Sequence, residues 1–386
     1  MPCESGELMN PITRCLHTRS ETGDARPSVT PLYQNSAFDA GSTYFYTRKN
    51  NPNVEEFEEV VRGLEHARHG VAVATGMAAI RTCLEQLRPG DTMVLNGLVY
   101  GCSFKLVQRF CERFNVRLEV LDLTTPEGVE AIPAETRLVL FDTPTKPFLK
   151  TIDIASVADV TKAANPSALI VVDNTWATPI YQHPLSLGAD VSLHSATKYM
   201  SGHSDVMGGM LLTDRDDLAE AFRQERFYSG AILDPYAAWL LRRSMQTFGI
   251  RLERQAQTTA GMREFLADLP QVRNVYYPEI DGRQLRGYGG ILFIELRPDL
   301  VPRYAELVSA LQYFGSGTGM ACVTSMVAQP YTGSHASMTD AEKDHMGLSR
   351  SLVRLCFGLE EPEDLRRDLQ DALASLEQPV LSEVTV

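Results

Sequence analysis

The sequence predicts an α/β protein with a mostly parallel, doubly wound sheet and a smaller C-terminal α+β domain. Residues 1–52 are rich in Pro, Gly, Ser and Thr, residues 53–250 alternate short apolar runs with amphipathic segments, and residues 251–386 follow a different order. Strands that alternate with helices are typical of a parallel sheet covered on both faces. The chain of 386 residues also exceeds the roughly 250–300 residues at which single cores stop growing. We therefore expect an arm and two domains, divided at these positions.

Residues 1–52 are expected to form an extended arm. They show little periodicity, which is also typical of a disordered tail. The segments VTPLYQNSAF and STYFYTR nevertheless carry apolar and aromatic side chains. Such side chains favour an ordered arm that docks on a folded surface.

The region 53–250 contains segments with helical spacing of apolar side chains and segments that are continuously apolar. Helices are expected over residues 54–67, 77–87, 103–114, 125–132 and 153–164. Strands are expected over residues 70–76, 91–96, 117–123, 137–142, 168–174 and 189–195. Ligands of such sheets bind at the carboxyl ends of the strands. The candidate functional residues fall at those ends.

The C-terminal third has a mixed pattern. A long helical stretch over residues 234–269 is expected to lead into it. Strands are then expected over residues 289–296 and 352–359, and helices over residues 302–314 and 362–376. This order predicts the smaller α+β domain.

Composition narrows the classes of function. The formal net charge of −13 argues against a nucleic-acid partner and against an anionic membrane surface. The seven cysteines are scattered and include no CxxC pair, so neither a disulfide framework nor a metal site is expected. The sequence has no apolar run of the roughly 18 residues that a membrane span needs, and its start does not read as a signal peptide. The expected location is the cytoplasm.

Two features at predicted strand ends point to a cofactor. Thr75 and Gly76 lie where a predicted strand ends and a predicted helix begins. The free N–H groups at the start of a helix can bind phosphate. Most glycines at such junctions, however, only form turns. Asp173 ends the apolar run ALIVVD. A carboxylate at that place holds a protonated ring nitrogen or simply caps the next helix.

The third feature is Lys198, in the segment HSATKYMSGHSD. Its neighbours can crowd the amine, and desolvation favours the neutral form that Schiff-base chemistry requires. Lys198 follows Ser195 and Thr197, whose hydroxyls can reach a phosphate, and lies 25 residues after Asp173. A phosphate-binding junction, a carboxylate for a ring nitrogen and a lysine follow one another in this order, which fits pyridoxal phosphate better than a nicotinamide cofactor. The GxGxxG fingerprint of nicotinamide-binding proteins is not present in the alternating region.

With these motifs the chain resembles the Cys/Met-metabolism family of pyridoxal-phosphate enzymes, which includes cystathionine γ-synthase, methionine γ-lyase and O-acetylhomoserine sulfhydrylase. The matching segments are PSVTPLYQNSAF, YTRKNNP, ATGMAA, VYGCSF, DTPTKPFLKTIDI, VVDNTWATP, HSATKYMSGHSDVMGG and LVRLCFGLE, in this order. A series of this length is highly specific. The resemblance implies pyridoxal-phosphate fold type I, an amino-acid substrate, and a homotetramer, a dimer of dimers with shared active sites.

The resemblance also implies roles for individual residues. Lys198 would bind the cofactor covalently, and Tyr100 would stack on its ring and act as an acid. The other cofactor contacts would come from Tyr46, Arg48, Gly76, Met77, Asp173, Ser195 and Thr197. Of these, Tyr46 and Arg48 would reach the phosphate of a neighbouring subunit. Arg354 would bind the substrate carboxylate through a bidentate pair.

Several positions depart from the family pattern and bear on substrate binding. Lys146 replaces an asparagine that normally bonds the cofactor's ring oxygen, so it would alter the cofactor or contact the substrate, unless its side chain points elsewhere. Thr324, in GMACVTSM, replaces a glutamate that accompanies cystathionine specificity, and the extra residues YTGSH follow. Cys102 matches a cysteine of the methionine γ-lyases. Arg226 and Phe227, however, replace the Lys-Asp pair of those enzymes.

These features predict γ-elimination on an L-amino acid with a leaving group at Cγ, as in methionine γ-lyase or on an unusual substrate such as a γ-chlorinated amino acid. The alternative is a γ-replacement enzyme of the O-acylhomoserine sulfhydrylase or cystathionine γ-synthase type. A protein that only binds the cofactor is a third alternative. The presence of Lys198, Asp173 and Arg354 argues against it.

Overall fold

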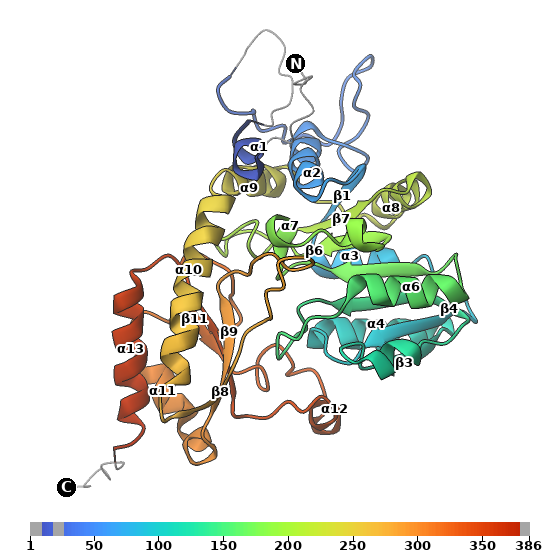
Figure 1. The fold of residues 1–386 in the computed structure, drawn as a ribbon. Helices are drawn as coiled ribbons and strands as arrows, with labels where there is room; N and C mark the ends of the chain where they lie inside the picture. Colours follow the sequence, from blue (N-terminus) through green and yellow to red (C-terminus); the bar gives the residue numbers. More distant parts are fainter. Residues whose placement is uncertain (1–9, 18–26, 379–386) are drawn as a thin grey trace, which may run out of the picture.

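The computed structural model describes residues 10–17 and 27–378 and contains two sheets (Figure 1). The larger sheet has seven strands in the order β1-β7-β6-β5-β4-β2-β3. Its pairs from β6 to β3 are parallel, whereas β7 pairs antiparallel with both neighbours. The strands are β1 (His69–Val73), β2 (Thr92–Asn96), β3 (Arg117–Leu121), β4 (Thr136–Asp142), β5 (Leu169–Asp173), β6 (Val191–His194) and β7 (Gly209–Thr213). The predicted mostly parallel sheet is confirmed.

Helices cover both faces of the larger sheet because its strands are apolar on both sides. Val71 of β1 packs in one cluster with Ile80 and Phe222, which come from α3 and α8. On the other face, Val139 of β4 packs with Val157 of α6. The covering helices are α2 (Pro52–Glu65), α3 (Gly76–Leu84), α4 (Gly101–Phe114), α5 (Pro126–Glu130), α6 (Ile154–Ala164), α7 (Thr178–Tyr181) and α8 (Asp216–Ser229). The sheet is therefore doubly wound, as predicted.

The smaller sheet has five strands in the order β10-β11-β12-β9-β8. Leu292 and Ile294 of β9 pack against helices of the same domain. Ile291 and Phe293 alternate with them and join a cluster shared with the larger domain. The elements are β8 (Val272–Tyr276), β9 (Ile291–Leu296), β10 (Gly315–Ser316), β11 (Met326–Ala328), β12 (Leu352–Cys356), the 3₁₀ helix η3 (Pro298–Arg303), α11 (Tyr304–Ala310), α12 (Asp340–His345) and α13 (Pro362–Ser375).

The helical stretch predicted over residues 234–269 consists of two helices, α9 (Pro235–Met245) and α10 (Phe248–Ala267). Asp234 caps α9 by accepting N–H groups of its first turn. In Figure 1, α10 runs along the smaller sheet beside α13. The boundary predicted at residue 250 falls inside α10, and the division into domains stays a prediction.

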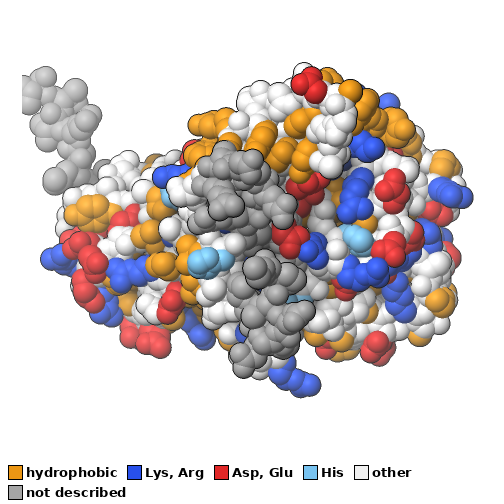
Figure 2. All heavy atoms as spheres, turned by 90° about the horizontal axis from the view of Figure 1, so that it is seen from above, with side chains coloured by type: hydrophobic (Ala, Val, Ile, Leu, Met, Phe, Trp, Pro, Cys, Tyr) orange, Lys and Arg blue, Asp and Glu red, His pale blue; other side chains and the backbone are white. Residues whose placement is uncertain are grey.

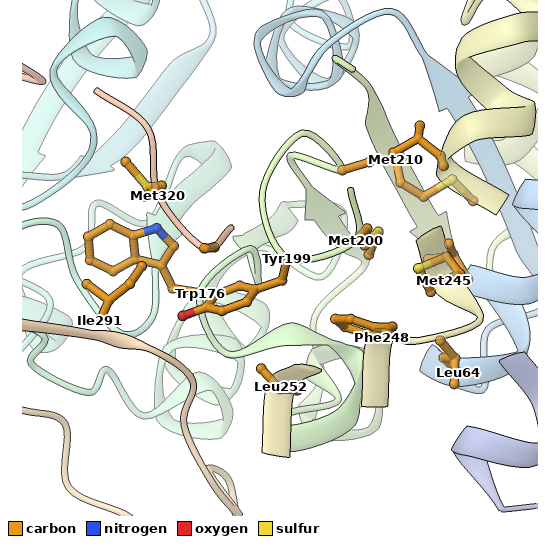
Figure 3. Packing of buried hydrophobic residues seen from close by; sticks show 14 of the residues in the cluster. Leu64, Trp176, Tyr199, Met200, Met210, Met245, Phe248, Leu252, Ile291 and Met320 are labelled. Atoms are coloured by element: carbon orange, nitrogen blue, oxygen red, sulfur yellow. The ribbon is translucent and has the colours of Figure 1, made fainter. Parts of the chain in front are cut away.

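The hydrophobic cluster between the two domains is seen from close by in Figure 3. Trp176 and Tyr199 enter it from the larger domain, and Ile291 and Met320 from the smaller one. The Tyr199 hydroxyl also accepts the Gly290 N–H at 2.9 Å. Because Tyr199 is the next residue after Lys198, this cluster holds the segment that carries the predicted nucleophile.

Some elements were missed by the sequence patterns. They are α1 (Pro11–His17), the short 3₁₀ helix η2 (Pro184–Leu187), α7, α8, α12, β7, β8, β10 and β11. Residues 27–51 form an arm without helices, and the Thr30 carbonyl accepts the Trp239 indole N–H at 2.9 Å. Within the described ranges, no helix is long and apolar enough to cross a membrane.

Candidate active site

A cavity of about 500 Å³ lies between the carboxyl ends of the parallel strands and the smaller sheet. Its walls come from the ends of β5 and β6, the start of α3, and strands β9 and β12. The predicted site residues that line it are Gly76, Met77, Tyr100, Lys146, Asp173, Ser195, Thr197, Lys198 and Arg354. The structure thus brings together residues that are up to 278 positions apart in the sequence (354 minus 76).

The first turn of α3 forms a seat suited to a phosphate group. Thr75 caps the helix, and its hydroxyl accepts the Ala78 N–H at 3.0 Å. The N–H groups of Gly76 and Met77 are left without intrahelical partners, as at any helix N-terminus. A Cβ at position 76 would lie 2.8 Å from the Ser195 Cβ, so only glycine allows this close approach.

The segment from Ser195 to Lys198 follows β6 and is fixed by backbone hydrogen bonds. The Ser195 N–H donates to the Thr175 hydroxyl at 2.8 Å, and the Thr197 hydroxyl accepts the Gly208 N–H at 3.1 Å. The Lys198 N–H donates to the Ser195 carbonyl at 3.1 Å. The backbone of the predicted nucleophile is therefore held rigidly beside the α3 seat.

The Lys198 amine lies in surroundings that favour its neutral form. Burial lowers the pKa of Lys198, and repulsion from Arg354 and Lys146 lowers it further. No described carboxylate forms an ion pair with the amine. A neutral amine is the form that acts as a nucleophile or a base.

Asp173 ends β5 with both carboxylate oxygens engaged. One oxygen accepts the Thr175 N–H at 2.9 Å, and the other accepts the Lys146 ammonium at 2.8 Å. The same ammonium lies 3.4 Å from the carboxylate of Asp142, which ends the neighbouring strand β4. Burial disfavours the ionised form of Asp173, but the attraction of Lys146 and these hydrogen bonds lower its pKa overall.

Arg354 reaches the cavity from the middle of β12. Its guanidinium donates to the Gly319 carbonyl at 2.8 Å and to the Gly317 carbonyl at 3.3 Å. Its Nε is buried without a hydrogen-bond partner, and no carboxylate in the described residues pairs with the side chain. A buried arginine of this kind is suited to a carboxylate that comes from outside the protein.

Tyr100 stands before the first residue of α4, and its N–H donates to the Asp142 carboxylate at 3.1 Å. Burial raises the pKa of Tyr100 to about 12, and a hydrogen bond to Cys102 adds to this effect. The phenol is therefore protonated at neutral pH and able to donate. Cys102 lies beside it but does not line the cavity.

Other predicted residues lie outside the cavity of their own chain. The Arg48 guanidinium donates to the Phe227 carbonyl at 3.4 Å and lies 4.5 Å from the centroid of that ring. Tyr46 packs beside it, with its ring centroid 5.3 Å from the guanidinium carbon. Thr324 is exposed and is not among the lining residues. The roles of these residues stay predictions.

The lining residues that were not predicted include Ser334 and His335. They belong to the extra segment YTGSH, which folds back against the start of α4: a Cβ on Gly101 would lie 2.8 Å from the Ser334 carbonyl oxygen. The His335 Nε2 lies 3.3 Å from the Val99 carbonyl, and burial lowers the pKa of His335 to about 4. The sequence showed the insertion, but no periodicity indicated where it packs.

The residues present fit pyridoxal phosphate. The N-terminus of α3 suits its phosphate, the carboxylate of Asp173 suits its ring nitrogen, and the neutral amine of Lys198 suits its aldehyde. The unpartnered Nε of Arg354 suits the carboxylate of an amino acid. Fold and site together define a pyridoxal-phosphate-dependent enzyme of fold type I.

Comparisons with known proteins agree with this class. The model of the family described as "Cys/Met metabolism PLP-dependent enzyme" matches residues 12–374. The chain is similar to a cystathionine β-lyase of Coxiella burnetii, with 35% identity over 94% of this chain and 97% of that protein. It is similar to an L-methionine γ-lyase of Pseudomonas putida, with 34% identity over 96% of this chain and 98% of that protein.

Among solved structures, a cystathionine γ-synthase of Xanthomonas oryzae pv. oryzae superimposes with a TM-score of 0.91 and 32% identity, over 98% of this chain and 99% of that one. The chain therefore belongs to the Cys/Met metabolism family of pyridoxal-phosphate-dependent enzymes. The predicted family, fold type and cofactor are confirmed. The family and the names of these relatives indicate a pyridoxal-phosphate-dependent lyase, as predicted.

Proposed function

We propose that the protein catalyses γ-elimination on an L-amino acid whose leaving group is attached to Cγ. One observation carries the proposal: Lys198, Tyr100 and Arg354 line one cavity in which Asp173 is the only carboxylate of the described lining residues. Such a cavity offers a base, an acid and a carboxylate ligand. It offers no free anion to bind a second ammonium group at the far end of the substrate.

Each of the three residues has a defined part in the reaction. When bound, pyridoxal phosphate supplies an electron sink for negative charge on the substrate carbons. Arg354 binds the α-carboxylate and so orients Cα. Lys198, whose pKa is lowered, accepts the proton from Cα, and Tyr100, whose pKa is raised to about 12, donates a proton to the departing group.

The other cavity residues would hold the cofactor. Gly76, Met77, Ser195 and Thr197 surround the seat at the start of α3 and would bind the phosphate. Asp173 would bind the ring nitrogen, and Tyr100 would stack on the ring. These assignments rest on the geometry of one chain and on the family motifs.

We also infer a cytoplasmic homotetramer, a dimer of dimers whose active sites are shared between subunits. Arg48 and Tyr46 lie outside their own cavity, beside Phe227, which supports a role in a neighbouring subunit. A groove of about 760 Å³ next to them is lined by Phe45 and Tyr228, both exposed. Figure 2 views the molecule from the side of the arm and α2 and shows hydrophobic side chains on this face.

The leaving group is proposed to be methanethiol, acetate, succinate or a halide. The names of the relatives include β-lyase, γ-lyase and γ-synthase, so they do not select among these groups. Position 324, where the family pattern has the glutamate associated with cystathionine, is a threonine without a carboxylate. In this chain Thr324 is exposed and does not line the cavity. Cys102 beside Tyr100 favours the γ-lyase branch. Lys146 is not assigned to the departing group, because its ammonium lies 2.8 Å from Asp173 and 3.4 Å from Asp142.

The experiment is a substrate panel scored for two products. Purified holoenzyme is supplied with methionine, O-acetylhomoserine, O-succinylhomoserine and a γ-chlorinated amino acid, each with and without sulfide. We expect 2-oxo acid and ammonia in the absence of sulfide. A product that forms only when sulfide is present would instead assign γ-replacement of the sulfhydrylase type.

A further inference from the structure

A cluster of three charged residues lies at the wall of the cavity. The proposed reaction does not explain why the three occur together. Asp142, Lys146 and Asp173 are 2%, 7% and 6% exposed. The Lys146 ammonium lies 2.8 Å from one carboxylate and 3.4 Å from the other. Asp142 and Asp173 are register partners at the ends of the adjacent strands β4 and β5. The lysine therefore bridges two carboxylates that the sheet brings close together.

The charges of this cluster do not cancel in the protein alone. Two carboxylates and one ammonium leave one negative charge, and buried charges without a partner are costly. The imbalance is visible at Asp142, because burial raises its pKa to about 7 even though Lys146 opposes the rise. A protonated ring nitrogen at Asp173 would bring the sum to zero.

The two carboxylates differ in their hydrogen-bond partners and in their access to the cavity. Asp142 accepts the Tyr100 N–H at 3.1 Å, and Lys146 is the only cation near it in the described residues. Asp173 lines the cavity, whereas Asp142 does not. If Lys146 turned toward the substrate, Asp142 would lose the one charge that keeps it ionised.

We propose that Lys146 is a positioning residue that stays between Asp142 and Asp173 in the loaded enzyme, and that this cluster sets how strongly Asp173 holds the proton of the cofactor's ring nitrogen. The inference rests on the bound pyridoxal phosphate and is independent of γ-elimination. In the family pattern the residue at this position is a neutral asparagine. The replacement by Lys146 thus adds a charge next to the carboxylate that pairs with the ring.

Other titratable groups also face the cluster and have to be held constant in a test. They are Tyr100, Lys198 and His335, and behind them Cys102 and Arg354, which act on Tyr100 and Lys198. None of them lies within hydrogen-bond distance of the Asp142 carboxylate or the Lys146 ammonium, except for the backbone N–H of Tyr100. Substitutions at Asp142 and Lys146 can therefore be compared with these groups unchanged.

The test compares two cofactors on each variant. Full-chain protein is freed of cofactor and titrated at pH 8 with pyridoxal phosphate and with its 1-deaza analogue, in which a C–H group replaces the ring nitrogen. The ratio of the two Kd values measures only the contribution of the ring nitrogen, because phosphate and Lys198 contacts are common to both. Asp142→Asn leaves Lys146 with Asp173 alone, so we expect the preference for pyridoxal phosphate to fall about tenfold or more, the equivalent of one pKa unit.

The second variant is Lys146→Met, which keeps the length of the side chain and removes the charge. We expect the preference to rise above that of the unmodified protein, because Asp173 then faces the ring nitrogen without a competing cation. Without the charge of Lys146, we expect Asp142 to be protonated. Adding Asp142→Asn to Lys146→Met should therefore leave the ratio of the two Kd values unchanged, and such non-additivity indicates that the two residues are coupled. Lys105→Met, which removes a lysine paired with Glu342 away from the cavity, is the matched control and should leave the preference unchanged.

The proposal is overturned if Asp142→Asn leaves the preference unchanged, because Lys146 would then have turned to the ring oxygen or the substrate and left Asp142 neutral. The proposal is also overturned if Asp142→Asn lowers the preference for pyridoxal phosphate equally in the unmodified protein and in the Lys146→Met variant. If the Lys146→Met protein does not fold, Asp142→Asn alone still shows whether Lys146 stays between the two carboxylates or turns to the ring oxygen or the substrate. Its amide has the size of the carboxylate and keeps an oxygen for the Tyr100 N–H.

Discussion

Arg354 of β12 lies directly opposite Phe293 of β9, and both side chains line the cavity that contains Lys198. In the proposed reaction, the smaller sheet would thus provide Arg354 as the ligand for a substrate carboxylate, and Lys198, which follows a strand of the larger sheet, would be the nucleophile. Neither sheet carries a complete site. The hydrophobic cluster around Trp176 and Tyr199 contains residues of both parts of the chain, so in the proposed reaction it would fix the distance between Arg354 and Lys198.

Replacement of Lys198 by alanine should abolish covalent attachment of the cofactor and lower turnover more than about a thousandfold, as the loss of an essential nucleophile does. Borohydride reduction followed by mass spectrometry of peptides checks the attachment directly. In the unmodified protein, the cofactor mass should lie on the peptide that contains Lys198. Lys105→Ala serves as control and should keep both attachment and turnover. Near-normal turnover of Lys198→Ala would exclude its role.

Arg48→Ala should weaken cofactor retention even though Arg48 does not line the cavity of its own chain. When Arg48→Ala protein is mixed with Lys198→Ala protein and the subunits are allowed to exchange, hybrid assemblies contain some sites with both residues intact. We expect partial recovery of activity, measured against each variant incubated alone. If subunits exchange and activity does not return, the arm serves only its own chain.

Gly76→Ala should lower the affinity for pyridoxal phosphate about tenfold or more, because the new Cβ would lie 2.8 Å from the Ser195 Cβ and an overpacked site costs about 1–3 kcal/mol. Equilibrium titration of cofactor-free protein gives the Kd. Gly261→Ala is the matched control, since a Cβ there meets no atom within 4 Å and the position lies in α10. An unchanged Kd for Gly76→Ala would mean that the α3 seat does not hold the phosphate.

His335 should make stability depend on pH. Burial lowers its pKa from 6.5 to about 4 in the folded protein, so between these values the unfolded chain binds a proton that the folded chain does not. Its contribution is complete above about pH 6.5 and is lost as pH falls toward 4, by up to about 3 kcal/mol. Urea unfolding from pH 4 to pH 7 measures this. His335→Gln should flatten the dependence, and an unchanged slope would contradict the assignment.

The sequence predicted most of the larger domain because its helices and strands have strong, regular apolar patterns. It also predicted the residues that gather at the strand ends, since the carboxyl ends of parallel strands share one edge of a sheet. The antiparallel strand β7 was missed because it follows a Gly-rich loop without the helix that a parallel crossover requires.

The partner of Lys146 and the place of His335 could not be derived from the sequence. Both depend on contacts between distant segments: Lys146 meets Asp173 across 27 positions, and His335 meets the Val99 carbonyl across 236. Spacing rules describe neighbours within a helix or strand and carry no information about such contacts. The family motifs located Lys146 as a departure, but only the structure identifies the two carboxylates around it.

Cystathionine should be a poor substrate compared with amino acids that carry a small or neutral group at Cγ. Its distal ammonium would enter a cavity in which Asp173 is the only carboxylate of the described lining residues, and that carboxylate is already paired with Lys146. An unpaired buried ammonium costs several kcal/mol, which corresponds to a thousandfold or more at roughly 1.4 kcal/mol per decade. The measurement is a competition in which cystathionine, methionine, O-acetylhomoserine and a γ-halogenated amino acid are present at equal concentration. Faster consumption of cystathionine than of the other three would contradict this prediction and favour a cystathionine enzyme.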